Sequence, residues 1–191
     1  MTVNNNRLKR LQVVGISGSL RQDSYNRKVL QIAKMIAAKL DTEVKEVDLK
    51  QLELPVYDSD IESQGFPAAV QRLRNVVEHA NVLLIASPEY NHSISGALKN
   101  AIDWLSITKN ILSGKTVAMF GASTGLYGTL RAQIHLRQIL TALNVTMLPQ
   151  PQIFIRSANE AFNEDGSLKD IKLYNQLKEL VEKTISLVRG N

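Results

Sequence analysis

The segment from Ser17 to Asn26 concentrates side chains that bind anions. It follows a short apolar run and leads into a stretch of helical periodicity, so backbone N–H groups at a helix start would point toward the same ligand. Hydroxyls, an amide and a guanidinium in such a loop can together bind a phosphate dianion. Capping of the helix by Ser24 or Asn26 would explain one or two of these residues, but not their concentration. The segment therefore predicts a phosphate site made by Ser19, Arg21, Ser24 and Asn26.

The class of phosphate ligand can be narrowed, because two common phosphate-binding motifs are missing from this loop. The Walker pattern needs Gly-Lys-Ser/Thr at the helix start, and the dinucleotide fingerprint needs three spaced glycines. Here the only glycines are Gly15 and Gly18. A hydroxyl-rich turn favours the terminal phosphate of a mononucleotide over the bridging pyrophosphate of NAD. An NAD-binding dehydrogenase is the weaker alternative, with Asp48 as its ribose-binding acid.

Two further segments follow apolar runs and are suited to a planar ring. The segment from Ser87 to Ser93 contains Pro88, which stiffens the backbone, and Tyr90, which offers a flat face. The segment from Gly121 to Gly128 is rich in glycine, so a ring could lie close to its backbone. The stretch from Pro88 to Asn91 could also be a plain turn, and Tyr90 a buried aromatic residue. Together the two segments are predicted to hold a flavin ring.

Composition limits the remaining chemistry. The chain has 191 residues, 44% of them apolar and 21% charged, which predicts one domain over residues 1–191 with residues 1–10 as a flexible tail. It has no cysteine and only three scattered histidines, so we expect no metal site, no thiol nucleophile and no iron–sulfur cluster. Any redox chemistry must then come from a bound organic cofactor.

Charge and hydropathy indicate which partners to expect. The net charge is +5, but basic and acidic residues are interspersed, so no nucleic-acid partner is predicted. No apolar run approaches the roughly 20 residues of a membrane span. We therefore expect a soluble protein of the cytoplasm whose partners are small molecules.

The elements that must position these segments follow from the hydrophobic pattern. Apolar, β-branched runs alternate with helical segments, which is typical of a parallel sheet covered by helices on both faces. We predict an α/β three-layer sandwich with a five-stranded parallel sheet in the flavodoxin-like order 2-1-3-4-5. The polar segments would then share the carboxyl edge of the sheet, where such folds bind ligands. The predicted strands are residues 11–16, 43–47, 82–86, 116–120 and either 145–148 or 153–155; the predicted helices are 27–40, 68–79, 96–105, 130–143 and 168–188.

Three motifs carry a family resemblance. They are Gly18-Ser19-Leu20-Arg21 with Ser24-Tyr25-Asn26, then Pro88-Glu89-Tyr90-Asn91-His92-Ser93, and then the stretch from Gly96 to Ser106 that contains Leu98-Lys99-Asn100-Ala101-Ile102-Asp103-Trp104. With them the chain resembles the NADPH-dependent FMN reductase family, most closely its bacterial quinone and chromate reductase branch. The resemblance covers residues 11–143 and implies FMN as cofactor, with NADPH or NADH as co-substrate.

The resemblance also implies roles for single residues. Ser19, Leu20, Arg21, Ser24 and Asn26 would surround the FMN phosphate. Pro88, Glu89, Tyr90 and Asn91 would line the isoalloxazine, largely through main-chain groups, and Ser123 would approach the ring from the third loop. The chain departs from the family at Ser95, where many relatives have proline and where a hydroxyl cap could replace it. It also departs at Thr129-Leu130. A homodimer or homotetramer, formed through the helices after strands three and four, is implied too.

The hypothesis for function is an FMN-dependent NAD(P)H oxidoreductase. It would pass hydride from NAD(P)H through FMN to quinones, azo compounds, free flavin or chromate-type oxyanions by a ping-pong mechanism. We assign no catalytic side chain. His92 could donate a proton or face solvent. Arg131 and Arg137 could contact a dinucleotide phosphate, a partner subunit or solvent. Asp103 and Trp104 are expected to pack or to form a subunit contact. The alternatives are a non-enzymatic flavodoxin-like electron carrier, which the basic charge disfavours, and a flavin-free regulatory module.

Overall fold

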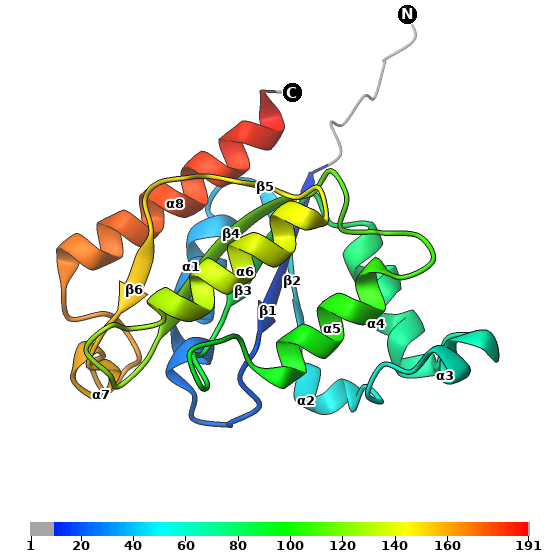
Figure 1. The fold of residues 1–191 in the computed structure, drawn as a ribbon. Helices are drawn as coiled ribbons and strands as arrows, with labels where there is room; N and C mark the ends of the chain where they lie inside the picture. Colours follow the sequence, from blue (N-terminus) through cyan, green and yellow to red (C-terminus); the bar gives the residue numbers. More distant parts are fainter. Residues whose placement is uncertain (1–9, 191) are drawn as a thin grey trace, which may run out of the picture.

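The strands form one parallel sheet. The computed structural model describes residues 10–190. Strand order is β2-β1-β3-β4-β5, with β6 also paired to β4, and every pairing is parallel (Figure 1). This confirms the predicted flavodoxin-like order. The strands are β1 (Leu11–Ser17), β2 (Thr42–Val47), β3 (Val82–Ala86), β4 (Thr116–Ala122), β5 (Thr146–Met147) and β6 (Ile153–Ile155).

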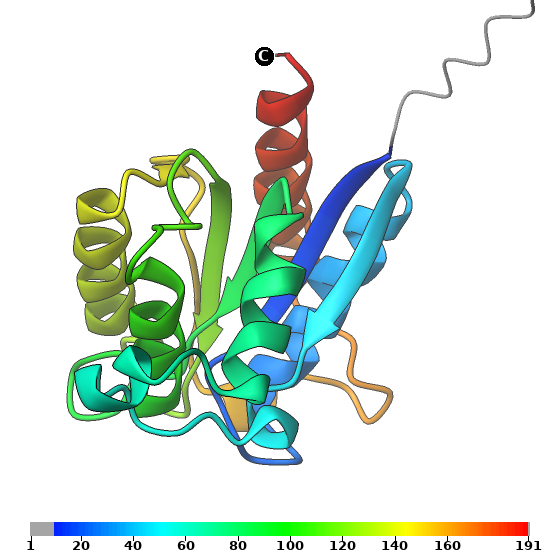
Figure 2. The same ribbon diagram turned by 90° about the vertical axis from the view of Figure 1, so that its right-hand side faces the viewer.

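Helices cover both faces of this sheet, as predicted (Figures 1 and 2). On one face lie α1 (Tyr25–Ala38) and α8 (Ile171–Arg189); on the other lie α4 (Ala68–Glu78), α5 (Gly96–Ser106) and α6 (Leu130–Ala142). The packing of β3 on both faces explains why its sequence is apolar throughout. Its alternate residues Val82 and Leu84 pack toward α1 and α8, while Leu83 and Ile85 pack toward the opposite helices. A strand buried on both faces has no polar positions.

The fifth position of the sheet differs from the prediction. One strand was expected at 145–148 or at 153–155, and the structure has both. Strand β5 pairs with β4 at Thr116 and Val117, and β6 pairs with β4 from Phe120 to Ala122. Pro149 and Pro151 lie between them. Because proline has no N–H to donate to a ladder, the pairing is interrupted there.

Three short helices were not predicted: α2 (Leu49–Leu52), α3 (Ser59–Ser63) and α7 (Ala158–Ala161). None is long enough to show a helical period. The long helices differ from prediction only at their ends, where caps decide the boundary. Helix α8 begins at Ile171 rather than at residue 168, since Asp170 accepts hydrogen bonds from the N–H groups of Lys172 and Leu173.

Most of the predicted N-terminal tail, residues 1–9, lies outside the described residues. Arg10 is described, is exposed and pairs with Asp41 at 2.8 Å. Within residues 10–190 every helix is too short or too polar to cross a lipid bilayer.

Asp48, the candidate ribose-binding acid, is engaged within the chain. Arg27 Nη1 lies 3.0 Å from Asp48 Oδ2 and Arg27 Nη2 lies 2.8 Å from Oδ1. Asp48 Oδ1 also accepts from the N–H of Lys50 at 2.9 Å and so caps α2. The hydrogen bonds from Arg27 hold the pKa of Asp48 below its ordinary value. This carboxylate stabilises the fold, which removes the support for an NAD-type site.

Replacement of Asp48 should therefore reveal a pH-dependent loss of stability. Asp48→Asn is expected to lower the free energy of unfolding at pH 7 by about 1–2 kcal/mol, because it breaks a charge-assisted bidentate pair. A carboxyl whose pKa is lowered on folding stabilises the protein above its unfolded pKa. The difference between wild type and variant should thus shrink as the pH falls through the folded pKa of Asp48. Urea unfolding between pH 7 and pH 3 measures it.

Asp58→Asn is the matched control. Asp58 caps α3 through Asp60 N at 2.8 Å, and no arginine pairs with it within residues 10–190. An equal loss in both variants would show that the Arg27 pair contributes nothing.

Candidate functional site

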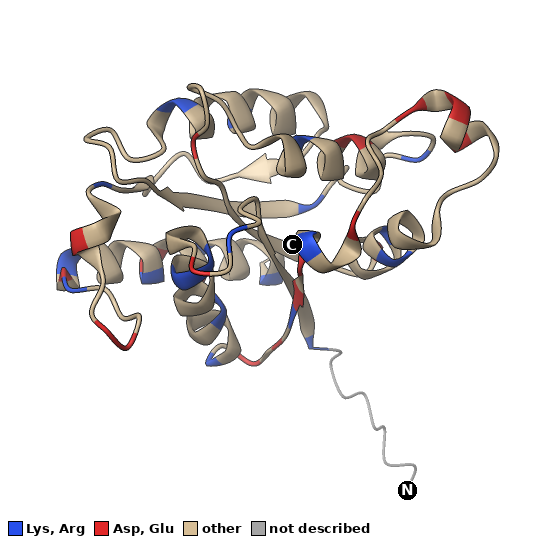
Figure 3. Ribbon diagram, turned by 90° about the horizontal axis from the view of Figure 1, so that it is seen from below, with Lys and Arg blue, Asp and Glu red and all other residues tan. Residues whose placement is uncertain are grey.

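The register of the sheet brings the three predicted loops to one edge. Ser17 at the end of β1 is level with Ala86 at the end of β3, and Ala86 is level with Phe120 of β4. The segments after these strands therefore emerge side by side at the carboxyl edge, which Figure 3 views face on. This is the edge at which parallel α/β sheets bind ligands.

A cavity of about 160 Å³ opens between these three loops. All of the predicted FMN-binding residues line it except Leu20 and Asn91, which are exposed beside it. Three further lining residues were not predicted as part of the site: Tyr25, Ala122 and Thr124. Their place next to Ser24, Asn26 and Ser123 in the sequence was the available signal. The lining residues are Ser19, Arg21, Ser24, Tyr25, Asn26, Pro88, Glu89, Tyr90, Ala122, Ser123 and Thr124.

The first loop has the donors that a phosphate requires. Ser19 and Ser24 are buried, and Ser24 Oγ accepts from Asn26 N at 3.1 Å to cap α1, which leaves its O–H free to donate. The backbone N–H groups of residues 20–25 form no hydrogen bond with any other described residue. Together with exposed Arg21, this donor set at the start of a helix fits the phosphate of FMN.

Asn26 has a larger share in the scaffold than the sequence suggested. Its Nδ2 donates to the carbonyl oxygen of Ala122 and its Oδ1 accepts from Ala122 N, both at 2.9 Å. The amide thus joins the first loop to the end of β4. Only the second Nδ2 hydrogen is left for an anion. Asn26 therefore fits the phosphate site as a minor donor and as the residue that keeps two walls together.

Loss of this amide should destabilise the whole protein. Asn26→Ala leaves the N–H and carbonyl of buried Ala122 without partners, so the free energy of unfolding is expected to fall by about 2–4 kcal/mol. Ser24→Ala, which removes a helix cap in the same loop, is expected to cost about 1 kcal/mol. Chemical denaturation of both variants measures the difference. Equal losses would contradict a special role for the Asn26 amide.

The second loop makes a tight turn beside the cavity. Tyr90 and Ser93 exchange backbone hydrogen bonds at 3.0 Å, with Asn91 and His92 in the left-handed region at φ of 50° and 63°. Tyr90 is 50% exposed, so one face of its ring is accessible to a ligand. His92 is exposed on the same turn. The carboxylate of Glu89 bonds to the start of α6, which is compatible with the expected use of this loop's main chain toward a ring.

Three further residues, for which the sequence left more than one role open, form contacts within the fold: Ser95, Asp103 and Trp104. Ser95 is the predicted hydroxyl cap: its Oγ accepts from Leu98 N at 3.2 Å and donates to the carbonyl of Gly18 at 2.6 Å. Trp104 is fully buried and donates to the carbonyl of Pro55 at 2.8 Å. Asp103 forms an ion pair with Lys99 at 2.7 Å. Trp104 therefore packs in the core, whereas Asp103 is partly exposed and lies beside α6.

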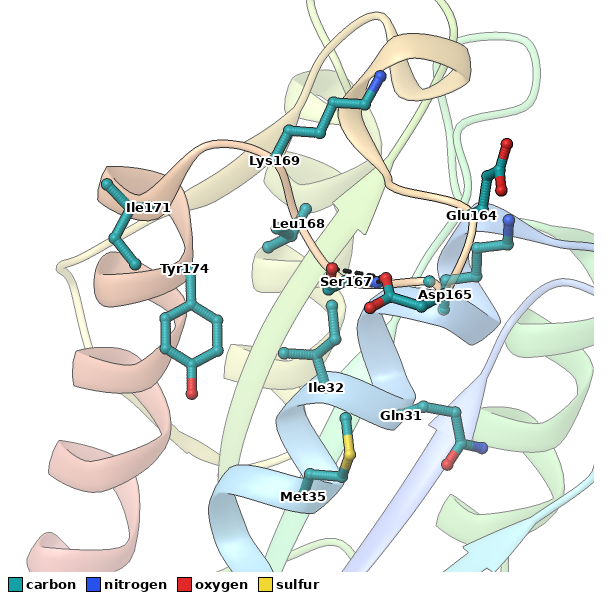
Figure 4. A pocket seen from close by; sticks show the side chains of 12 residues that line it. Gln31, Ile32, Met35, Glu164, Asp165, Ser167, Leu168, Lys169, Ile171 and Tyr174 are labelled. Atoms are coloured by element: carbon teal, nitrogen blue, oxygen red, sulfur yellow. Dashed lines mark hydrogen bonds between the residues drawn. The ribbon is translucent and has the colours of Figure 1, made fainter.

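A cavity larger than the one at the carboxyl edge lies elsewhere among the described residues. It measures about 770 Å³ and is formed by α1, the segment 164–169 and the first turn of α8 (Figure 4). Its walls are largely apolar, with Ile32, Met35 and Leu168 facing the space. None of the sequence-predicted site residues lines it. Size therefore does not identify the site in this protein, whereas the gathering of donors at the carboxyl edge does.

Comparison with known proteins decides the family. Residues 11–160 match the model of NADPH-dependent FMN reductases. The chain belongs to the NADPH-dependent FMN reductase family. Membership confirms the predicted class, an NAD(P)H-dependent oxidoreductase that works with FMN. The match begins at β1 and runs through all three loops that line the cavity.

Individual members of the reductase family are similar over most of this chain. An NAD(P)H-dependent FMN reductase of Pseudomonas aeruginosa is 42% identical over 181 residues, covering 94% of both chains. A quinone reductase of Escherichia coli K12 is 40% identical over 146 residues, covering 75% of this chain and 77% of its own. Among solved structures, the NAD(P)H:(acceptor) oxidoreductase FerB of Paracoccus denitrificans superposes with a TM-score of 0.84 at 32% identity, covering 94% of this chain and 98% of its own.

Proposed function

We propose that this reductase binds FMN in the carboxyl-edge cavity and reduces small-molecule acceptors with electrons from NAD(P)H. The observation that carries the proposal is the convergence of Ser19, Arg21, Ser24 and Tyr90, from two separate loops, on one cavity at the carboxyl edge. Bound FMN would supply the hydride chemistry, accepting from NAD(P)H and giving to the acceptor in two successive half-reactions. The chain's own residues bind, orient and shield.

Each wall has a distinct task. The hydroxyls of Ser19 and Ser24, the free N–H groups of residues 20–25 and the guanidinium of Arg21 would hold the phosphate. Leu20, exposed beside them, would cover the phosphate from the solvent side. Ala122 at the end of β4 lines the cavity and is 3% exposed, so it would help to exclude water there.

The ring would lie between the other two loops. Pro88 and Tyr90 form one wall, with Asn91 exposed beside it, and Ser123, whose Oγ accepts from Gly125 N at 3.1 Å, begins the other. Backbone N–H groups in these walls would stabilise negative charge that develops on the ring. No described side chain at this edge has to act as nucleophile or as general acid. Catalysis would then rest on placement of the two substrates in turn at one exposed face.

The acceptors we propose are quinones first, then azo compounds, free flavin and chromate-type oxyanions, with the two half-reactions giving ping-pong kinetics. The similarity to a quinone reductase of Escherichia coli supports quinones. The open side of the cavity, flanked by half-exposed Tyr90, would admit a flat aromatic acceptor. We propose the cytoplasm as the place of action, because reduced nicotinamide cofactors are formed there.

Loss of the phosphate donors should release FMN. Arg21→Ala and Ser19→Ala are each expected to weaken FMN binding by about tenfold, because each removes one strong hydrogen bond to a dianion. Quenching of FMN fluorescence on titration measures Kd, and bleaching of the flavin absorbance by NADPH measures the first half-reaction. Arg72→Ala, an exposed arginine of α4, is the control and should leave both unchanged.

Three results would contradict the proposal. They are a wild-type protein that does not bind FMN, full FMN retention by both phosphate-loop variants, or bound flavin that NADPH does not bleach. The last result would favour an electron carrier instead of a reductase.

We also propose that two copies associate through α5 and α6. A groove of about 430 Å³ runs between these helices, and its lining includes apolar Ile102 and Ile139 together with Lys99, Asp103 and His135. On α6 beside it, Ile134 is 57% exposed. An exposed apolar side chain next to a groove is typical of a subunit contact. A homodimer, or a tetramer of such dimers, would bury both the groove and the Ile134 side chain.

A charge at this contact should separate the subunits. Ile134→Glu is expected to convert the assembly to monomers, because an unpaired carboxylate would be buried in the interface. Sedimentation velocity measures the mass. Met35→Glu, at an equally exposed position on α1, is the control and should leave the assembly intact. A wild type that sediments as a monomer, or an Ile134→Glu variant that stays associated, would contradict this interface.

A further inference from the structure

Helix α6 starts without a cap of its own. Its N-cap residue is Thr129, which is fully buried and makes no side-chain cap hydrogen bond. Thr129 Oγ1 instead accepts from Gln133 Nε2 at 2.9 Å, one turn further along the helix. The first N–H groups of a helix have no partner within it. At α6 they must therefore be satisfied from elsewhere.

Glu89 satisfies them from the neighbouring loop. Its Oε2 accepts from Arg131 N at 3.0 Å and from Ala132 N at 3.1 Å, and its Oε1 lies 3.5 Å from Arg131 Nη1. The Glu89 side chain is only 10% exposed, so these bonds are shielded from water. A carboxylate here also meets the positive end of the helix dipole. The N-cap of α6 is thus supplied by a residue 42 positions earlier in the chain.

This contact joins two walls of the carboxyl-edge cavity. Glu89 belongs to the wall that contains Pro88 and Tyr90, and α6 directly follows the glycine-rich segment that starts at Ser123. Backbone bonds to β6 and α7 hold the base of that segment, from Ser123 N to Ile155 O at 3.0 Å and from Ala158 N to Ser123 O at 3.1 Å, whereas Leu126 at its tip is 77% exposed. The Arg131 guanidinium, which Glu89 approaches, lies 4.8 Å from the centre of the Tyr127 ring. Glu89 thereby contacts both the first turn of α6 and the arginine that stacks on Tyr127.

We propose that Glu89 is a positioning residue for the flavin site. Its carboxylate keeps the segment 123–129 in the arrangement that binds FMN, by capping α6 and by orienting Arg131 under Tyr127. The inference rests on the proposed function, because it assigns this role toward FMN. It differs from the role expected from the sequence, in which Glu89 lines the ring through its main chain.

The expected loss of FMN affinity follows from the fraction of molecules in which the segment 123–129 has the arrangement that binds FMN. When the cap is lost, the segment samples arrangements that do not bind, and the apparent Kd rises in inverse proportion to the competent fraction. The free energy that a helix cap contributes is enough to change the ratio of binding to non-binding arrangements by up to about tenfold. Glutamine keeps an oxygen in place of Oε2, and one oxygen accepts both N–H bonds in the structure. The amide should therefore retain most of the positioning.

The experiment compares three variants of the full-length chain. Glu89→Ala removes the cap, Glu89→Gln retains an acceptor, and Asp170→Ala removes the equivalent cap of α8, where Asp170 accepts from Lys172 N and Leu173 N away from the cavity. FMN is the probe, and fluorescence quenching gives its Kd. Thermal unfolding in the absence of FMN gives the stability of each variant.

We expect Glu89→Ala to weaken FMN binding by about fivefold to tenfold, Glu89→Gln by less than about threefold, and Asp170→Ala not at all, although both alanine variants melt at lower temperature than wild type. If Glu89→Ala does not fold, Glu89→Asp replaces it, because its shorter side chain no longer reaches α6. Equal FMN affinity in Glu89→Ala and Asp170→Ala, or equal weakening in the alanine and glutamine variants, overturns the inference. Failure of the wild type to bind FMN would instead overturn the proposed function.

Discussion

The parallel register of β1, β3 and β4 is the constraint on which the site depends. Because the three strands run in one direction, with β1 and β3 ending level and β4 ending at Ala122, just past Phe120 that is level with them, the segments that follow emerge at the same edge. Burial of both faces of the strands maintains this register, since a one-residue slip in β3 would exchange Val82 and Leu84 with Leu83 and Ile85 between two differently shaped cores. The cavity exists because the sheet is packed from both sides.

Register alone places the loops side by side, and polar contacts between them give the cavity its shape. Asn26 joins the first loop to the end of β4, Ser95 joins the start of α5 to Gly18, and Glu89 joins the second loop to α6. Each contact satisfies backbone groups that burial has removed from water, so each is costly to break. Side chains that look like ligands in the sequence thus also build the walls. A loop with this many polar residues serves the ligand and the scaffold together.

The distribution of free and engaged groups separates the two parts of the site. In the first loop, the hydroxyls of Ser19 and Ser24 and a run of backbone N–H groups remain available within the described residues, which suits a phosphate. In the other two loops Glu89 bonds to the start of α6 and Ser123 Oγ accepts from Gly125 N, while the ring of Tyr90 is half exposed. This division matches a molecule with a charged end and a planar end.

The sequence by itself determined the strand order, the two-sided helix cover and the three loops that make the site, because apolar periodicity and helix caps such as Ser24 and Ser95 are local signals. It also determined the family, through contiguous motifs. Only the tertiary structure decided that Asp48 pairs with Arg27, that the Asn26 amide is committed to Ala122, and that Glu89 caps a helix from another loop. Those partners lie 21 to 96 residues away. Residue types and spacing encode what a side chain can bond to, whereas the choice among distant partners is made by the packing that brings one of them within reach.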